Sequence, residues 1–244
     1  MAMLPENRLS TERILETLLS GDLFSATETL LRAGARIDYQ NAEGSTFLHM
    51  AAEVGDERVV GLLMEWGAVV NSRDHCGRTA LHAAAAYGHH GPADLLIKSG
   101  AVLEARAKDD DDEGWTPLFS AALEGYADVV ALLLSHGACV NPYLKESHLT
   151  PLHLAAREGH TKVVELLITY GASPDAITNH HVTPLHCAAF YNHQDVIQVL
   201  VHSGANLGLK SKAGFSAHDF AQLRRQEDVP QLLEFLDSLM ENGD

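Results

Sequence analysis

A block of about 33 residues recurs along this chain, and this repetition limits what the chain can fold into. The most constant member of the block is a leucine, with successive spacings of 33, 37, 34 and 33 residues, at Leu48, Leu81, Leu118, Leu152 and Leu185. A pair of alanines follows each leucine, and a Gly-Ala pair ends each block. A period of this length indicates a repeat architecture, in which one small unit is stacked on copies of itself.

The copy that begins at Thr150 predicts two short helices. Thr150 suits the N-cap of the first helix, and Pro151 suits its first helical position, where a missing N–H costs nothing. Gly159 and Gly171 suit the helix ends. The apolar face of the second helix is formed by Val163, Val164, Leu166 and Leu167. Such a unit is too short to bury its own apolar face, so it needs a neighbour on each side.

The blocks resemble the ankyrin repeat, a unit of a turn and two helices with a Thr-Pro-Leu-His type of motif. Thr150–His153 and Thr183–His186 match this motif in full, and the other copies match in part. The resemblance covers roughly residues 10–240. It implies an all-α solenoid of five full repeats with an N-terminal and a C-terminal capping repeat.

The expected organisation is a single elongated domain. We expect a disordered lead over 1–9, an ankyrin-repeat domain over 10–240 and a frayed tail over 241–244. The caps are expected at about 10–41 and 209–240, and the full repeats at about 42–74, 75–107, 108–145, 146–178 and 179–208. Terminal repeats are expected to depart from the pattern because one face of each meets water.

Several positions break the pattern inside the array. Gly91-Pro92 falls within an expected second helix, and proline is tolerated only in a first turn, so that helix is predicted to start late, near Pro92. Arg106–Gly114 holds an insertion, which we expect to be a solvated acidic loop. Asn192 replaces a helix-ending glycine, and asparagine tolerates the left-handed conformation better than most residues. Asp219 stands where a histidine is expected.

Composition narrows the choice of partner and compartment. The formal net charge of −16 disfavours nucleic acid and anionic membranes, and favours a protein partner with a basic patch. The three cysteines lie in different repeats without CxxC spacing, which indicates reduced thiols. With no segment typical of a signal peptide or membrane span, we expect a cytoplasmic monomer, with the nucleus left open as a second compartment.

The many histidines do not predict a metal centre or a cofactor. The resemblance implies that His49, His82, His153 and His186 hydrogen-bond to the nearby threonine and to the backbone of the adjacent repeat. No set of three or four converging ligands is visible among the other histidines. A calcium loop starting at Asp109 would place Gly114 sixth, but its twelfth residue is Ser120 instead of glutamate. We therefore expect no metal and no cofactor.

The resemblance also indicates where a partner would bind. Ankyrin domains use a concave face lined by hairpin tips and by the two variable residues after the paired alanines. Those variable pairs are Glu53-Val54, Ala86-Tyr87, Leu123-Glu124, Arg157-Glu158 and Phe190-Tyr191. Aromatic residues and arginine dominate binding hot spots, so the candidate partner-binding residues are Tyr87, Trp115, Tyr143, Arg157, Phe190, Tyr191, His75 and Arg73. The alternative for the aromatics is partial burial against a neighbouring repeat.

No catalytic motif is present: the chain has no nucleophile elbow, glycine-rich phosphate loop or HExxH motif. The sequence therefore predicts a non-enzymatic protein–protein interaction module or scaffold. The alternative is an inhibitor or regulatory subunit of a partner enzyme in a kinase, phosphatase or ubiquitin-ligase pathway. A SOCS-box adaptor is disfavoured because the expected C-cap leaves no room for that box.

Overall fold

The computed structural model describes residues 23–109, 112–223 and 229–241, which form thirteen helices and two short strands. The lead over 1–9, the first helix expected after Ser10 and the tail beyond Glu241 lie outside these ranges. The chain is thus an all-helical fold with little strand.

The helices follow one another in pairs, and within the pairs from α3–α4 to α11–α12 two or three residues join the two helices. A single helix, α2 (Leu23–Arg32), comes first. The pairs are α3 (Phe47–Val54) with α4 (Glu57–Glu65), α5 (Ala80–Ala86) with α6 (His90–Lys98), α7 (Pro117–Glu124) with α8 (Ala127–Ser135), α9 (Pro151–Glu158) with α10 (Thr161–Thr169), α11 (Pro184–Phe190) with α12 (Gln194–His202), and α13 (Ala217–Leu223) with α14 (Val229–Glu241).

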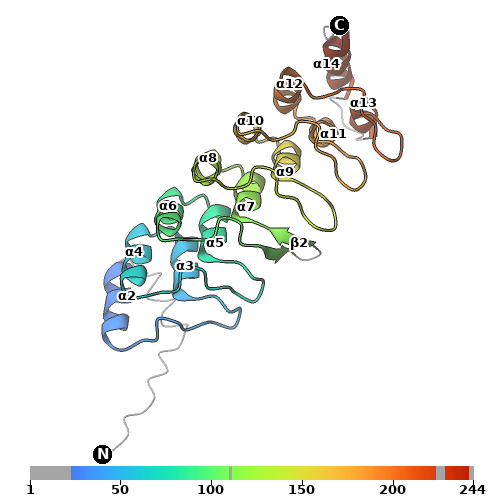
Figure 1. Cartoon of the computed structure of the whole chain (residues 1–244). Helices are drawn as coiled ribbons and strands as arrows, with labels where there is room; N and C mark the ends of the chain where they lie inside the picture. Colours follow the sequence, from blue (N-terminus) through green and yellow to red (C-terminus); the bar gives the residue numbers. More distant parts are fainter. Residues whose placement is uncertain (1–22, 110–111, 224–228, 242–244) are drawn as a thin grey trace, which may run out of the picture.

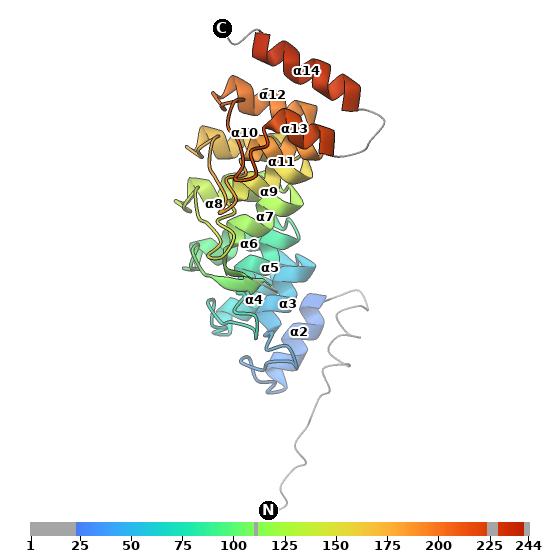
Figure 2. The ribbon, with the colours of Figure 1, turned by 90° about the vertical axis from the view of Figure 1, so that its right-hand side faces the viewer.

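The pairs stack into one elongated array with two rows of helices (Figure 1). The first helices of the pairs, from α3 to α13, contact one another in one row, while α2, α4, α6, α8, α10 and α12 form the second row. The connecting hairpins project together from one side of the stack, and α2 and α14 lie at opposite ends of it (Figures 1 and 2). The array therefore presents a long face made of first helices and hairpins.

The buried core runs the length of the stack, as repetition requires. The five repeat leucines are each at most 2% exposed, and so are the paired alanines. Alanine allows two helices to approach closely, and Val, Leu and Ile of the second row fill the remaining space. No single pair of helices holds such a core by itself.

Threonine and glycine define the ends of the first helices as the sequence predicts. Thr46, Thr116 and Thr150 are N-caps with extended backbone. Gly159 ends α9 with a left-handed φ of 81°. Asn192 adopts φ 60°, which confirms that asparagine replaces glycine in this conformation.

Two local expectations are wrong. Helix α6 does not start late: it begins at His90, at the same distance after its repeat leucine as the other second helices, so Pro92 falls within its first turn. The insertion is not a plain loop but an antiparallel hairpin, β1 (Ala107–Asp109) paired with β2 (Asp112–Trp115). The backbone N–H of Lys108 also donates to the carbonyl of Cys76, which ties this hairpin to the preceding one. The side chains of Asp109–Glu113 lie outside the described part of the structure.

The last pair keeps the capping geometry without its histidine. The Asp219 carboxylate accepts hydrogen bonds from the backbone N–H and the hydroxyl of Ser216, at 2.8 and 2.7 Å. These bonds lower the pKa of Asp219. An acid here performs the capping that the imidazole performs elsewhere.

Candidate functional site

Four histidines are bonding elements of the scaffold, as the resemblance implies. In α9 the Nδ1 atom of His153 lies 2.8 Å from Thr150 Oγ1, and Nε2 lies 3.0 Å from the carbonyl of Val182 in the next repeat. Because a carbonyl can only accept, Nε2 carries the proton and Nδ1 accepts from threonine. Burial lowers the pKa of His153 to about 4, so the ring is neutral at pH 7. The same bonds are made by His49, His82 and His186.

A second set of histidines hydrogen-bonds to the preceding repeat instead of the following one. His160 Nε2 lies 2.9 Å from the carbonyl of Leu123 in the preceding repeat, and its ring covers Gly125, where an added Cβ would lie 2.5 Å from the imidazole. His89 and His193 make equivalent bonds. These seven imidazoles hold the scaffold together and are not a site.

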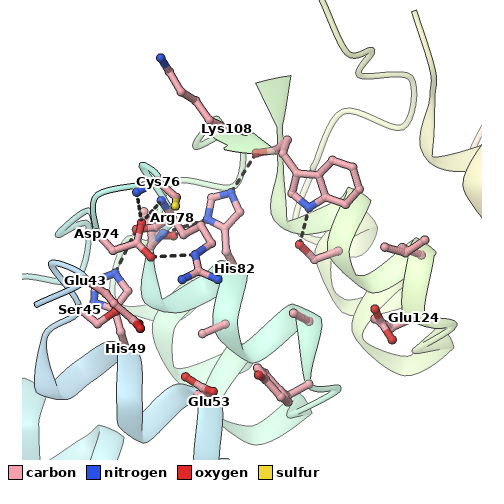
Figure 3. Close-up of a pocket in the computed structure, with 17 residues that line it drawn as sticks. Glu43, Ser45, His49, Glu53, Asp74, Cys76, Arg78, His82, Lys108 and Glu124 are labelled. Carbon is pink, nitrogen blue, oxygen red and sulfur yellow. Dashed lines mark hydrogen bonds and ion pairs between the residues drawn. The ribbon is translucent and has the colours of Figure 1, made fainter. Parts of the chain in front are cut away.

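The concave face carries a groove of about 480 Å³ beside helices α3, α5 and α7. The β1–β2 hairpin forms one wall through Lys108 and Trp115 (Figure 3). Tyr87 and Ala83 line the groove from α5, and Leu123 lines it from α7. We call this the concave groove. Its volume lies within the range typical of ligand pockets, and its lining is part apolar and part polar.

The lining of the concave groove is acidic on balance. It includes four carboxylates, from Glu43, Glu53, Asp74 and Glu124, and two cations, from Arg78 and Lys108. Asp74 is buried and bound to Arg78 at 2.7 Å, so this pair neutralises itself. Glu43 and Glu53 come from one repeat and Glu124 from the second repeat after it (Figure 3).

Tyr87 is the most open aromatic side chain in the concave groove, with 51% of its surface exposed. The Glu53 carboxylate, and more weakly the negative charge of Glu124, raise the pKa of Tyr87. Carboxylates on the two helices that flank α5 therefore both act on this one phenol.

Trp115 lines the same groove but also packs into the scaffold. Its indole N–H donates to Ser120 Oγ at 2.9 Å, and its ring stacks on Phe119 with 5.3 Å between centroids. Its backbone carbonyl accepts from His82. Trp115 is thus a wall of the groove that supports the fold.

A second groove, of about 540 Å³, lies at the hairpin tips. It brings together three of the predicted residues, Arg73, His75 and Tyr143, of which Tyr143 is 54% exposed. Arg73 spans two tips by donating to the carbonyls of Gly77 and Arg106. The other charged lining residues are three cations, Arg106, Lys108 and Lys145, and the carboxylate of Asp74. The two grooves thus have opposite charge and share the β1–β2 hairpin.

The other predicted residues lie outside both grooves, nearer the C-terminal end. The Arg157 guanidinium binds its neighbour Glu158 at 2.7 Å. Phe190 is half-buried and packs edge-to-face with Tyr191 and Phe220, at 5.1 and 6.4 Å between centroids. The predicted set is therefore divided among three places.

The sequence did not single out the carboxylates of the concave groove. Glu53 and Glu124 occupy variable positions after the paired alanines, and that was the only signal for them. Arg106 and Lys108 lie at the start of the insertion Arg106–Gly114, whose acidic run hides these two cations in the sequence. Their role depends on which hairpins and helices lie side by side.

Other chemistry finds little support in the described residues. In residues 23–109, 112–223 and 229–241, no group of three or more His, Cys, Asp or Glu side chains is arranged to hold a metal ion. Cys76 and Cys139 are exposed, whereas burial raises the pKa of Cys187 to about 12 and keeps it a thiol.

None of the helices in the described ranges combines the length and the apolar character that crossing a membrane requires.

Comparisons with known proteins agree with this architecture. A family model described as ankyrin repeats in three copies matches residues 16–109, 67–143 and 141–211. A solved structure, the human ASB11 ankyrin repeat domain, is similar with a TM-score of 0.79 and 27% identity, over 91% of this chain and 96% of that one. A comparison with curated proteins gives no match. Because the family model covers most of its length, this chain belongs to the ankyrin repeat family.

Proposed function

We propose that this protein is a non-enzymatic interaction module that holds a segment of a partner protein in the concave groove. Ankyrin repeats are protein-binding modules, and the groove supplies a place for a partner. The observation that carries the proposal is the half-exposed Tyr87 ring, which lines the concave groove together with carboxylates of α3 and α7. Exposed aromatic residues in such positions are typical binding hot spots.

The charge of the groove supports a partner with a basic patch. Three glutamates line it, and the whole chain carries −16. Such a field speeds association with cationic surfaces and slows association with anionic ones. Nucleic acid and anionic membranes are therefore not proposed as partners.

The test compares two tyrosines that are similarly exposed. Tyr87→Ala removes the aromatic ring of the groove, while Tyr170→Ala removes a ring that is 44% exposed at the end of the outer helix α10. Proteins captured from cell extract by the unaltered chain should be lost with Tyr87→Ala and kept with Tyr170→Ala. Equal capture by both variants would contradict the assignment. Trp115 is less suitable because its replacement also disturbs Phe119 and Ser120.

The finer organisation is part of the same proposal. We propose five full repeats between two capping repeats, in a monomer that acts in the cytoplasm. The three cysteines, which form no disulfide, support a reducing compartment. Sedimentation at several concentrations tests the monomer, and a tagged chain in intact cells tests the location.

An inhibitor or regulatory subunit of a kinase, phosphatase or ubiquitin-ligase enzyme would use the same groove. Adding the protein to the activity assay of a captured enzyme separates the two functions. Lost turnover indicates inhibition, and unchanged turnover indicates tethering.

A further inference from the structure

The concave groove contains a cluster of three side chains from consecutive repeats, which we call the Tyr87 cluster: Glu53, Tyr87 and Glu124. Glu53 lies near the end of α3, Tyr87 is the C-cap residue of α5, and Glu124 is the last residue of α7. Tyr87 and Glu124 occupy the same position in neighbouring repeats, so the stacking of α5 on α7 sets them side by side.

The carboxylates of this cluster lie on the two helices that flank the ring. Glu53 belongs to α3 and Glu124 to α7, both of which pack against α5, and both side chains line the same groove as Tyr87. The Glu53 carboxylate, and more weakly Glu124, raise the pKa of Tyr87. The Tyr87 ring stacks on the His89 ring, with 6.3 Å between centroids. About half of the Tyr87 side chain is still exposed, and Ala83 and Ala86 line the groove with it.

We propose that the Tyr87 cluster binds an arginine side chain of the partner segment, an inference that rests on the proposed function of the concave groove. A guanidinium stacked on the Tyr87 ring directs its N–H groups outward, parallel to the ring. Carboxylates at the perimeter of the ring are where those N–H groups meet acceptors. A lysine ammonium lacks this planar set of donors and binds more weakly at such a site.

The arginine already present in the groove does not satisfy this cluster. The Arg78 guanidinium is bound to the buried carboxylate of Asp74 through Nε, at 2.7 Å. Asp74 is held in turn by the backbone N–H groups of Cys76 and Arg78. Arg78 is therefore part of the hairpin, while Glu53 and Glu124 face the groove (Figure 3).

The experiment titrates the full chain with a nine-residue Gly/Ser peptide that carries two arginines. Matched peptides carry lysine or citrulline, the neutral isostere of arginine. Binding is followed by NMR shifts of the Tyr87 ring. We expect about tenfold weaker binding of the citrulline peptide and a smaller loss with lysine.

Two pairs of charge variants distinguish binding at the Tyr87 cluster from attraction by the net charge of the chain. Glu53→Gln with Glu124→Gln should weaken the arginine peptide about tenfold. Glu65→Gln with Glu165→Gln removes the same charge from exposed residues of α4 and α10, in the second row of helices. This pair should change the affinity for the arginine peptide by less than about twofold. Equal weakening by both pairs, or equal binding of the arginine and citrulline peptides, would overturn the arginine site.

The captured partner distinguishes this inference from the function on which it rests. A partner lost with Tyr87→Ala but kept by Glu53→Gln with Glu124→Gln leaves the groove as the docking site and removes the arginine preference. A partner kept by both variants removes the docking site as well.

Discussion

Two neighbouring junctions of this array are held together by different chemistry. Between α9 and α11, His153 links Thr150 to the carbonyl of Val182 through hydrogen bonds. Between α7 and α9, Phe119 stands in the histidine position and is fully buried. Within the part of the chain that the structure describes, the Thr116 hydroxyl is buried without a hydrogen-bond partner.

The apolar junction replaces the lost hydrogen bonds with a cluster of its own. Phe119 packs with Leu144 and Leu154, and Trp115, Leu123 and Leu149 surround them. This cluster is separate from the core that runs through the rest of the stack. An interface between two repeats can therefore be stabilised by a neutral imidazole with hydrogen-bond partners or by an apolar ring with apolar neighbours.

The largest effect is expected when the apolar junction loses its ring. Phe119→Ala should lower the free energy of unfolding by about 4 kcal/mol, since it opens a cavity and removes the centre of the cluster. Urea unfolding, followed through Trp115 fluorescence in a Trp66→Phe background, measures this loss. Val69→Ala, at a position 66% exposed, is the control and should change stability by about 0.5 kcal/mol or less. A small loss with Phe119→Ala would show that the cluster does not hold this junction.

At the polar junction, loss of the imidazole should lower the free energy of unfolding by a somewhat smaller amount. His153→Leu leaves the buried N–H and hydroxyl of Thr150 without a partner, which should cost about 3 kcal/mol. The same unfolding measurement applies. If leucine were tolerated here as phenylalanine is in α7, the hydrogen bonds would not be what stabilises this interface.

The two junctions should also differ in their response to acid. Burial lowers the pKa of His82 and His153 to about 4 in the folded chain, against about 6.5 when unfolded. The unfolded chain therefore binds more protons, and stability falls as the pH drops from about 6.5 to about 4, by up to about 1.4 kcal/mol per pH unit for each imidazole. In a His153→Gln variant, the free energy of unfolding should fall less over this pH range, by the contribution of one imidazole. Urea unfolding at several pH values measures this difference. If the free energy of unfolding depended on pH as steeply in this variant as in the unaltered chain, His153 would not be a source of the acid sensitivity.

The smallest effect, and the most direct comparison, concerns the threonine hydroxyls. Thr116→Val removes a buried hydroxyl that lacks a partner and should stabilise the chain by about 1 kcal/mol. Thr150→Val removes a hydroxyl bound to His153 and should destabilise it by about 2 kcal/mol. Thermal unfolding of both variants gives the two signs. The same sign for both would mean that the junctions do not differ as described.

Local chemistry explains why much of the fold could be predicted. Thr150, Pro151 and Gly159 specify a helix and its ends from neighbouring residues alone, and the repeat period supplies the packing partner. The late start predicted for α6 was wrong because the helix keeps the register of the other second helices, which places Pro92 in its first turn, where proline is tolerated. The β1–β2 hairpin was missed because an acidic run has low strand propensity.

The candidate site was less predictable because it is assembled across repeats. Tyr87 could be singled out, as the scaffold does not require an aromatic residue there. Glu53 and Glu124 become neighbours of that ring only when three first helices are stacked. For Trp115 the sequence left partial burial open as the alternative, and its hydrogen bond to Ser120 and its stacking on Phe119 confirm that alternative.

The opposed histidine bonds have a consequence for how such a chain can evolve. His153 donates a hydrogen bond to the following repeat, and His160 donates one to the preceding repeat. A unit that carries both histidines can therefore bond to a similar unit on either side. Gene duplication can lengthen an array of such units in any order. Phe119 limits that freedom locally, because it packs on Leu154 of the next unit instead of making the histidine bonds. Exchanging the unit that contains α7 would therefore require a matching apolar residue in its successor.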